Sequence, residues 1–121
     1  LGAGGAARAV ISALEDAGSD VVVASRRDPV WPPSTDGVDV VVNCTPVKEE
    51  LIVTPTAGMQ VVDLAYLPEG RDTALIAEAR RVGCEAVVDG LDVLLHQGAA
   101  AFRLWTGIEP PLEAMRAALR G

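Results

Sequence analysis

The chain opens on a glycine-rich motif whose residue types and spacing could bind a dinucleotide. Gly2-Ala3-Gly4-Gly5-Ala6-Ala7 fits the pattern G-x-G-x-x-A. In such a turn the first glycine permits the sharp bend and the second lets the backbone approach a pyrophosphate, while the small sixth residue lets a helix pack on a sheet. Free N–H groups and the helix dipole favour the anionic phosphates. A strand-to-helix turn without a ligand would show the same pattern, so the residues that follow must show whether a dinucleotide binds here.

Two arginines follow the apolar run Val21–Ala24, about 20 residues beyond the glycine motif, where NAD-binding proteins usually carry an Asp or Glu for the ribose 2′-hydroxyl. The sequence here is Ser25-Arg26-Arg27. A guanidinium can bind a 2′-phosphate through two hydrogen bonds, whereas a carboxylate would repel it. Asp28 comes later and beside two cations, so we do not interpret it as the ribose acid. The segment predicts NADP rather than NAD as the cofactor.

Groups for proton transfer and metal binding are scarce. His96 is the only histidine and Lys48 the only lysine, so a complete acid–base apparatus is not expected in this chain. Cys44 and Cys84 are separated by forty positions and show no C-x-x-C spacing, so we expect packed thiols rather than a metal site, a nucleophile or a disulfide. For His96 we expect a surface or packing role.

Length and charge set outer limits on the function. The chain has 121 residues, half of them hydrophobic, with a net charge of −7, which fits one folded domain. An acidic balance argues against nucleic acid or an anionic membrane as the main partner. There is neither an apolar run of about 20 residues nor a signal-peptide pattern, so we expect a cytoplasmic protein. Because the chain starts with Leu1, directly before the glycine motif, we expect it to be a piece of a larger polypeptide whose first strand is truncated.

Apolar runs alternate with helical patterns, which predicts an open α/β sheet. Continuous runs of Val and Ala are typical of parallel strands buried on both faces. Strands are expected at 21–24, 38–42, 61–64 and 86–88, helices at 5–17, 72–82, 91–105 and 111–120, and an irregular connection at 28–37. On the third of these helices, Leu91, Leu95, Phe102 and Trp105 share one face, which we expect to be the core. Gln97 lies on another face, beside small side chains, where it could reach across a cleft.

Several further segments, in this order along the chain, give it a resemblance to a known family. They are Asn43-Cys44-Thr45-Pro46, Asp63-Leu64-Ala65-Tyr66-Leu67-Pro68, Asp89-Gly90-Leu91, Leu94-Leu95-His96-Gln97-Gly98-Ala99 and Phe102-Arg103-Leu104-Trp105-Thr106-Gly107. With the glycine motif and Ser25-Arg26-Arg27, they resemble the C-terminal, NADP-binding half of the shikimate dehydrogenase family.

The resemblance implies a fold and an activity. The fold is a Rossmann-type open, mostly parallel sheet with helices on both faces, with residues 1–106 as the NADP-binding domain and 107–121 as a C-terminal helix packing toward a missing N-terminal domain. Members of the family interconvert 3-dehydroshikimate and shikimate with NADPH, in aromatic amino-acid biosynthesis through the chorismate pathway. Their catalytic Lys and Asp lie in the N-terminal domain, so no catalytic residue is expected in this chain, which alone should be inactive.

The resemblance also assigns site residues by position. Tyr66 and Gln97 match family residues that reach the substrate. Lys48 stands where the family usually has Gly, and we expect it to face solvent on a loop. The residues expected to bind the cofactor are Gly2, Ala3, Gly4, Gly5, Ala6, Ser25, Arg26, Arg27, Asn43, Cys44, Thr45, Pro46, Leu64, Gly90 and Val93.

Two alternatives stay open at this point. One is a quinate or quinate/shikimate dehydrogenase of the same superfamily, although those that prefer NAD tend to carry an acid where this chain has Ser25-Arg26-Arg27. The other is a non-catalytic NADP-binding module. An upstream domain carrying a Lys and an Asp would favour the enzyme over the module.

Overall fold

Three parallel strands form the sheet of the computed structural model, which describes residues 1–121. The strands lie in the order β1-β2-β3, with Val41 opposite Val61 and Val61 opposite Val87. The elements, in chain order, are α1 (Gly5–Asp16), β1 (Val40–Asn43), β2 (Gln60–Asp63), the short 3-10 helix η1 (Pro68–Gly70), α2 (Ala74–Val82), β3 (Ala86–Val88), α3 (Gly90–Thr106) and α4 (Leu112–Arg120).

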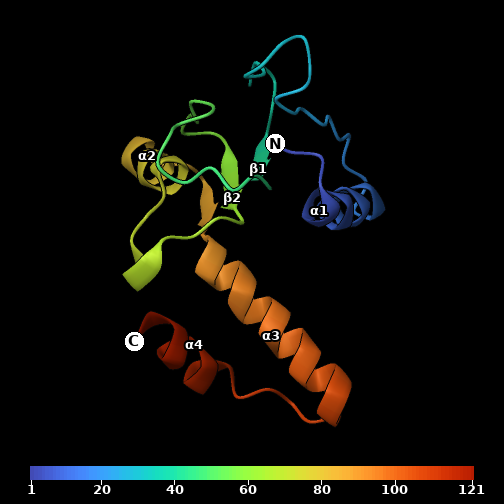
Figure 1. The fold of residues 1–121 in the computed structure, drawn as a ribbon, viewed down its shortest axis with the longest axis vertical. Helices are drawn as coiled ribbons and strands as arrows, with labels where there is room; N and C mark the ends of the chain where they lie inside the picture. Colours follow the sequence, from blue (N-terminus) through green and yellow to red (C-terminus); the bar gives the residue numbers. More distant parts are fainter.

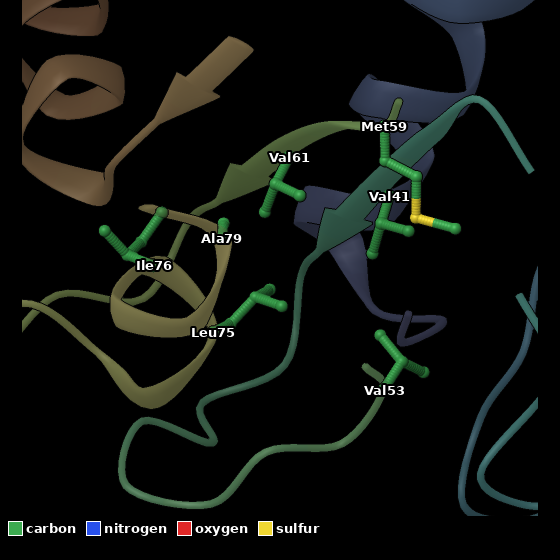
Figure 2. Close-up of a cluster of buried hydrophobic side chains, with 7 residues drawn as sticks. All are labelled: Val41, Val53, Met59, Val61, Leu75, Ile76 and Ala79. Atoms are coloured by element: carbon green, nitrogen blue, oxygen red, sulfur yellow. The ribbon is translucent and has the colours of Figure 1, made fainter. Parts of the chain in front are cut away.

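The core lies between the sheet and α2. Val41 and Val61 from neighbouring strands meet Leu75, Ile76 and Ala79 of the helix, and Val53 and Met59 complete the cluster (Figure 2). Helix α1 lies on the other side of the strands (Figure 1). The predicted Rossmann-type α/β class is confirmed. The expected burial of both strand faces is not observed: Val41 and Val61 are buried toward α2, whereas Val42 and Val62 on the other face are half-buried.

The predicted helices form, and polar caps and a glycine mark the ends of two of them. Thr73 caps α2 by accepting a hydrogen bond from the N–H of Ile76 at 3.3 Å, and Gly83 ends it in the left-handed region with φ 73°. Asp89 caps α3 in the same way, through the N–H of Asp92 at 3.0 Å. Residues 28–37 form neither helix nor strand, as predicted.

The strand predicted at 21–24 does not form. Only Leu1 and Gly2 lie between this segment and β1. On one side, the N–H of Gly2 donates to the carbonyl of Ala24. On the other side, the amino group of Leu1 donates to the carbonyl of Val42 at 2.7 Å and the carbonyl of Leu1 accepts from the N–H of Cys44 at 2.8 Å, as in a parallel pair. Val22, with no strand beside it, is 88% exposed. The sequence has the composition of a strand, but a strand also needs a neighbour that supplies a continuous ladder.

Helix α3 extends away from the sheet, and α4 folds back along α3 (Figure 1). Leu91 and Leu95 are buried as predicted, but Trp105 is 82% exposed because no element covers the far end of α3. The expectation that α4 packs toward another domain stays a prediction; in this structure it contacts α3, where Gly98 leaves room for Met115. None of the helices combines the length and the apolar character needed to cross a membrane.

Candidate functional site

The glycine turn brings the start of the chain against the end of β1. Gly2 has φ +96°, and a Cβ there would lie 3.2 Å from Cγ2 of Thr45, so both its conformation and its surroundings require glycine. Around Gly4 and Gly5, by contrast, a Cβ would meet nothing within 4 Å. No side chain caps α1, so its first N–H groups are free to bind an anion.

The arginine segment forms a tight turn that leaves both guanidinium groups available. The carboxylate of Asp28 accepts a hydrogen bond from the N–H of Ser25 at 2.7 Å, and the Ser25 hydroxyl accepts one from the N–H of Arg27 at 3.3 Å. Asp28 therefore shapes the turn. Arg26 and Arg27 are exposed, and neither takes part in an ion pair. The side chains of Arg26 and Arg27 are thus suited to bind a 2′-phosphate, whereas the side chain of Ser25 stabilises the turn.

An open cavity of about 350 Å³ lies at the carboxyl ends of β1 and β2. Ligands of open α/β sheets bind at this edge. The cavity gathers six of the predicted site residues with Lys48 and Ala65; the six are Ala6, Cys44, Thr45, Pro46, Leu64 and Tyr66.

Lys48 lies on a loop, as expected from sequence, but borders the open cavity instead of standing free in solvent. It is half-buried and lines the cavity, with its ammonium group 5.8 Å from the centroid of the Tyr66 ring. At this distance the cation and the ring attract each other. The backbone carbonyl of Lys48 accepts a hydrogen bond from the N–H of Ala74 at 2.8 Å, which ties this loop to the start of α2.

A buried polar network below the cavity holds the ends of both strands. Asn43 and Asp63 are opposite one another in the sheet, and the Asn43 amide donates to Asp63 at 2.9 Å. The other Asp63 oxygen accepts from the Thr73 hydroxyl at 2.6 Å, and Asn43 Oδ1 accepts from both N–H and hydroxyl of Thr45. The three residues Asn43, Asp63 and Thr73 are at most 2% exposed. Such a satisfied network fixes the loops that border the cavity.

This network gives one predicted site residue, Asn43, a different role, and it adds two residues to the site, Asp63 and Thr73. The side chain of Asn43 points inward and is fully used by protein partners, so it positions the loop instead of lining the opening. Asp63 and Thr73 were not among the predicted site residues. The available signal was the pair of polar residues that end two adjacent apolar strands, Asn43 and Asp63.

Gly90 lets α3 begin against the end of β2. A Cβ at this position would lie 2.4 Å from the carbonyl oxygen of Ala65 and 2.8 Å from that of Leu64. Gly90 also borders a neighbouring hollow of about 10 Å³, which is room for no more than a water molecule. Val93 is half-buried and Gln97 exposed, and neither lines the large cavity. The structure therefore does not join Tyr66 and Gln97 in one cavity.

The two cysteines are free thiols. Burial raises the pKa of Cys44, which keeps the thiol protonated at neutral pH. Desolvation also raises the pKa of Cys84, whose thiol donates to the carbonyl of Thr56 at 3.2 Å. Packed, protonated thiols agree with the expectation from sequence. His96 is exposed on α3.

Comparisons with known proteins agree on one family. A family model described as the Shikimate 5′-dehydrogenase C-terminal domain matches residues 90–120. Proteins named Shikimate dehydrogenase (NADP(+)) from Archaeoglobus fulgidus and Moorella thermoacetica are 44% and 39% identical to the chain. Each match covers 99% of this chain, against 55% and 51% of the relative, so the chain spans about half the length of the curated relatives it matches.

Solved structures give the same result. A shikimate dehydrogenase in complex with NADP+ is 39% identical with a TM-score of 0.61, over 70% of this chain and 32% of that one. A chorismate mutase/shikimate 5-dehydrogenase fusion protein from Clostridium acetobutylicum is 26% identical with a TM-score of 0.72, over 99% and 51%. Fold, ordered motifs and comparisons thus agree with the resemblance seen in the sequence: the chain belongs to the shikimate dehydrogenase family.

Proposed function

We propose that this chain is the NADP-binding half of a shikimate dehydrogenase, which interconverts 3-dehydroshikimate and shikimate. The observation that carries the proposal is the cavity itself, which joins the helix of the glycine turn at Ala6 with Cys44–Pro46 and Tyr66 at the edge of a parallel sheet. The family membership and the names of the relatives support it.

The residues present fit the cofactor. Gly4 and Gly5 leave open space at the uncapped start of α1, where the backbone N–H groups would hold a pyrophosphate. Arg26 and Arg27 would bind the 2′-phosphate of NADP. When bound, the nicotinamide would supply the hydride in the reducing direction and accept it in the oxidising direction. Thr45, Pro46 and Leu64 would then form a wall that orients the ring and excludes water.

This chain contributes binding and orientation, not proton transfer. In the proposal Tyr66 and Gln97 contact the substrate, and a preceding domain of the same protein supplies the Lys and Asp that handle the proton. The reaction belongs to aromatic amino-acid biosynthesis and takes place in the cytoplasm, which suits a chain with two free thiols.

A quinate dehydrogenase is the second candidate. A solved quinate dehydrogenase from Corynebacterium glutamicum in complex with NAD is 36% identical with a TM-score of 0.55, over 67% of this chain and 30% of that one. The two unpaired arginines favour NADP over NAD and thereby the first candidate. An assay of shikimate and quinate against NADP+ and NAD+, in the protein with its catalytic domain, separates the two.

The proposed cofactor site is tested by titrating the chain with NADP+ and NAD+. We expect NADP+ to bind more tightly. Arg26→Ala should weaken NADP+ binding about 10-fold or more, since charge-assisted hydrogen bonds contribute about 1.5–3 kcal/mol, and should leave NAD+ binding unchanged. Arg116→Ala, on α4, is the control and should alter neither affinity. NAD+ binding as tight as NADP+ binding would overturn the assignment.

A further inference from the structure

The only lysine of the chain carries a charge that no acidic side chain neutralises. The cations of all six ion pairs in the structure are arginines. Glu49 and Glu50 follow Lys48 directly, yet both are exposed and neither pairs with it. The ammonium group instead lies over the Tyr66 ring. A half-buried cation whose contact is the face of a ring can still bind an anion.

The backbone on either side holds Lys48 in place. The N–H of Val47 donates to the hydroxyl of Thr45 and its carbonyl accepts from Asn43, both at 3.3 Å. The carbonyl of Lys48 accepts from Ala74 at 2.8 Å. The loop is therefore tied to the buried network and to the start of α2. A charge held in advance on a fixed loop binds a ligand with less loss of entropy.

Lys48 is the only charged residue that lines the cavity. The others are Ala6, Cys44, Thr45, Pro46, Leu64, Ala65 and Tyr66, and burial keeps the Cys44 thiol protonated. Because the other walls are neutral, this single cation sets the sign of the electrostatic potential at the cavity and favours small anions.

We propose, on the basis of the proposed function, that Lys48 is a specificity residue that binds the carboxylate of the substrate, beside the Tyr66 phenol. The cofactor phosphates are already matched by the N-terminus of α1 and by Arg26 and Arg27. No other side chain of the cavity offers a positive charge to a carboxylate. Lys48 is assigned no proton-transfer role: it selects and orients an anion.

The test measures binding of shikimate and of its methyl ester to the chain, each with and without NADP+. The ester keeps the ring and hydroxyls but has no negative charge. We expect shikimate to bind about 10-fold or more tightly than the ester. Lys48→Gln should abolish this preference by weakening shikimate alone, and Lys48→Arg should retain most of it. Arg116→Gln removes the same charge outside the cavity and should leave the preference intact.

Each outcome separates this inference from the proposed function. Tighter binding of shikimate than of its methyl ester that persists in Lys48→Gln overturns the role of Lys48. So does the absence of this difference in the wild-type chain. Weakened NADP+ binding in Lys48→Gln with unchanged shikimate binding also overturns it, because Lys48 would then contact the cofactor. Failure of the unchanged chain to bind NADP+ counts against the proposed function, while the comparison of shikimate with its ester without cofactor still decides the role of Lys48.

Discussion

Gly5 and Gly90 are both the first residue of a helix, but the structure requires glycine at only one of them. At Gly90 an added Cβ would run into the backbone of Leu64 and Ala65, at distances of 2.4–2.8 Å. At Gly5 it would meet nothing within 4 Å. The sequence pattern treats both as ligand-binding glycines, whereas the structure makes Gly90 a residue of close packing.

These two glycines give a matched prediction. Gly90→Ala forces the start of α3 away from the end of β2 and should lower the free energy of unfolding by about 3 kcal/mol. Gly5→Ala should leave it unchanged or raise it by up to about 1 kcal/mol, because alanine favours the helix. Denaturant unfolding followed by far-UV circular dichroism measures both. Equal effects of the two substitutions would contradict the contact at Gly90.

The buried network supplies a second prediction for single residues. Thr73→Val removes the cap of α2 and leaves a buried Asp63 oxygen without its donor. We expect the free energy of unfolding to fall by about 1–3 kcal/mol. Thr54, exposed on a loop, is the control: Thr54→Val should stay within about 0.5 kcal/mol. A Thr73→Val protein as stable as the control would show that the network does not hold the loops.

Sequence predicts some of these residues and misses others for a physical reason. Gly2 and Arg26 belong to local patterns, so type and spacing suffice to find them. Lys48 contacts the Tyr66 ring through its side chain and Ala74 through its backbone, and both partners are distant in the chain. The inward turn of Asn43 depends on the strand register that sets it opposite Asp63. Contacts of this kind arise only once the sheet has formed.

Among the elements, α3 and α4 are joined at one end by a group of charges around Asp89. Arg120 of α4 donates to Asp89 at 2.8 Å and to Asp92 at 3.1 Å, and Arg80 of α2 lies 3.4 Å from Asp89. Partial burial works to raise the pKa of Asp89, but the N–H of Asp92 and the Arg120 guanidinium outweigh it, and the pKa lies below its ordinary value. The ionised carboxylate thus links three helices.

Asp89→Asn tests this link, since asparagine can still cap α3 but carries no charge. At neutral pH the free energy of unfolding should fall by about 0.5–1 kcal/mol. Because the folded-state pKa is lowered, the charge stabilises the fold above the ordinary aspartate pKa of about 4 and ceases to do so as the pH falls through the lower folded value.

Urea unfolding from pH 7 to pH 3 measures this dependence. The difference between the unchanged chain and Asp89→Asn should shrink across the acid range. Asp20→Asn, at an exposed aspartate outside the ion pairs, should show no such difference at neutral pH. A constant difference between the two proteins at all pH values would exclude an ionic contribution from Asp89.

Helices and strands are predicted correctly where the signal lies in the segment itself. They are predicted wrongly where the structure of a segment depends on the element that lies beside it. The apolar runs and helical patterns that predict α2 and α3 are local, and so are the residues that cap them in the structure, Thr73, Gly83 and Asp89. Val21–Ala24 has strand composition but lacks a continuous neighbour, and Trp105 continues an apolar helix face past the sheet that would bury it. Both errors concern which element lies next to the segment.

At the scale of the molecule, the chain contains the cavity and the glycine turn but spans about half the length of the curated relatives it matches. The aligned stretch of 150 positions in the Archaeoglobus fulgidus protein is longer than the 121 residues of this chain, so the relative has additional residues within the match. In this chain, residues 28–37 between the arginine segment and β1 form neither helix nor strand.

The division of labour proposed above gives a prediction for the chain as a whole. It should bind NADP+ but form no NADPH from shikimate, because its only lysine binds and orients and does not handle the proton. Absorbance at the wavelength of NADPH, followed over hours at high protein concentration, measures this. NADPH formation that scales with the amount of protein would show that this chain holds a complete catalytic apparatus.

The positions of the two tryptophans have a practical consequence for these measurements. Trp105 stands in solvent at the far end of α3, and Trp31 lies in the irregular segment that precedes β1. Neither belongs to the core cluster beneath the sheet. Trp105 is already in solvent, so its emission should change little when the chain unfolds, whereas the half-buried Trp31 reports on the loop around it. Secondary-structure signals therefore report unfolding of the core more directly than intrinsic fluorescence does.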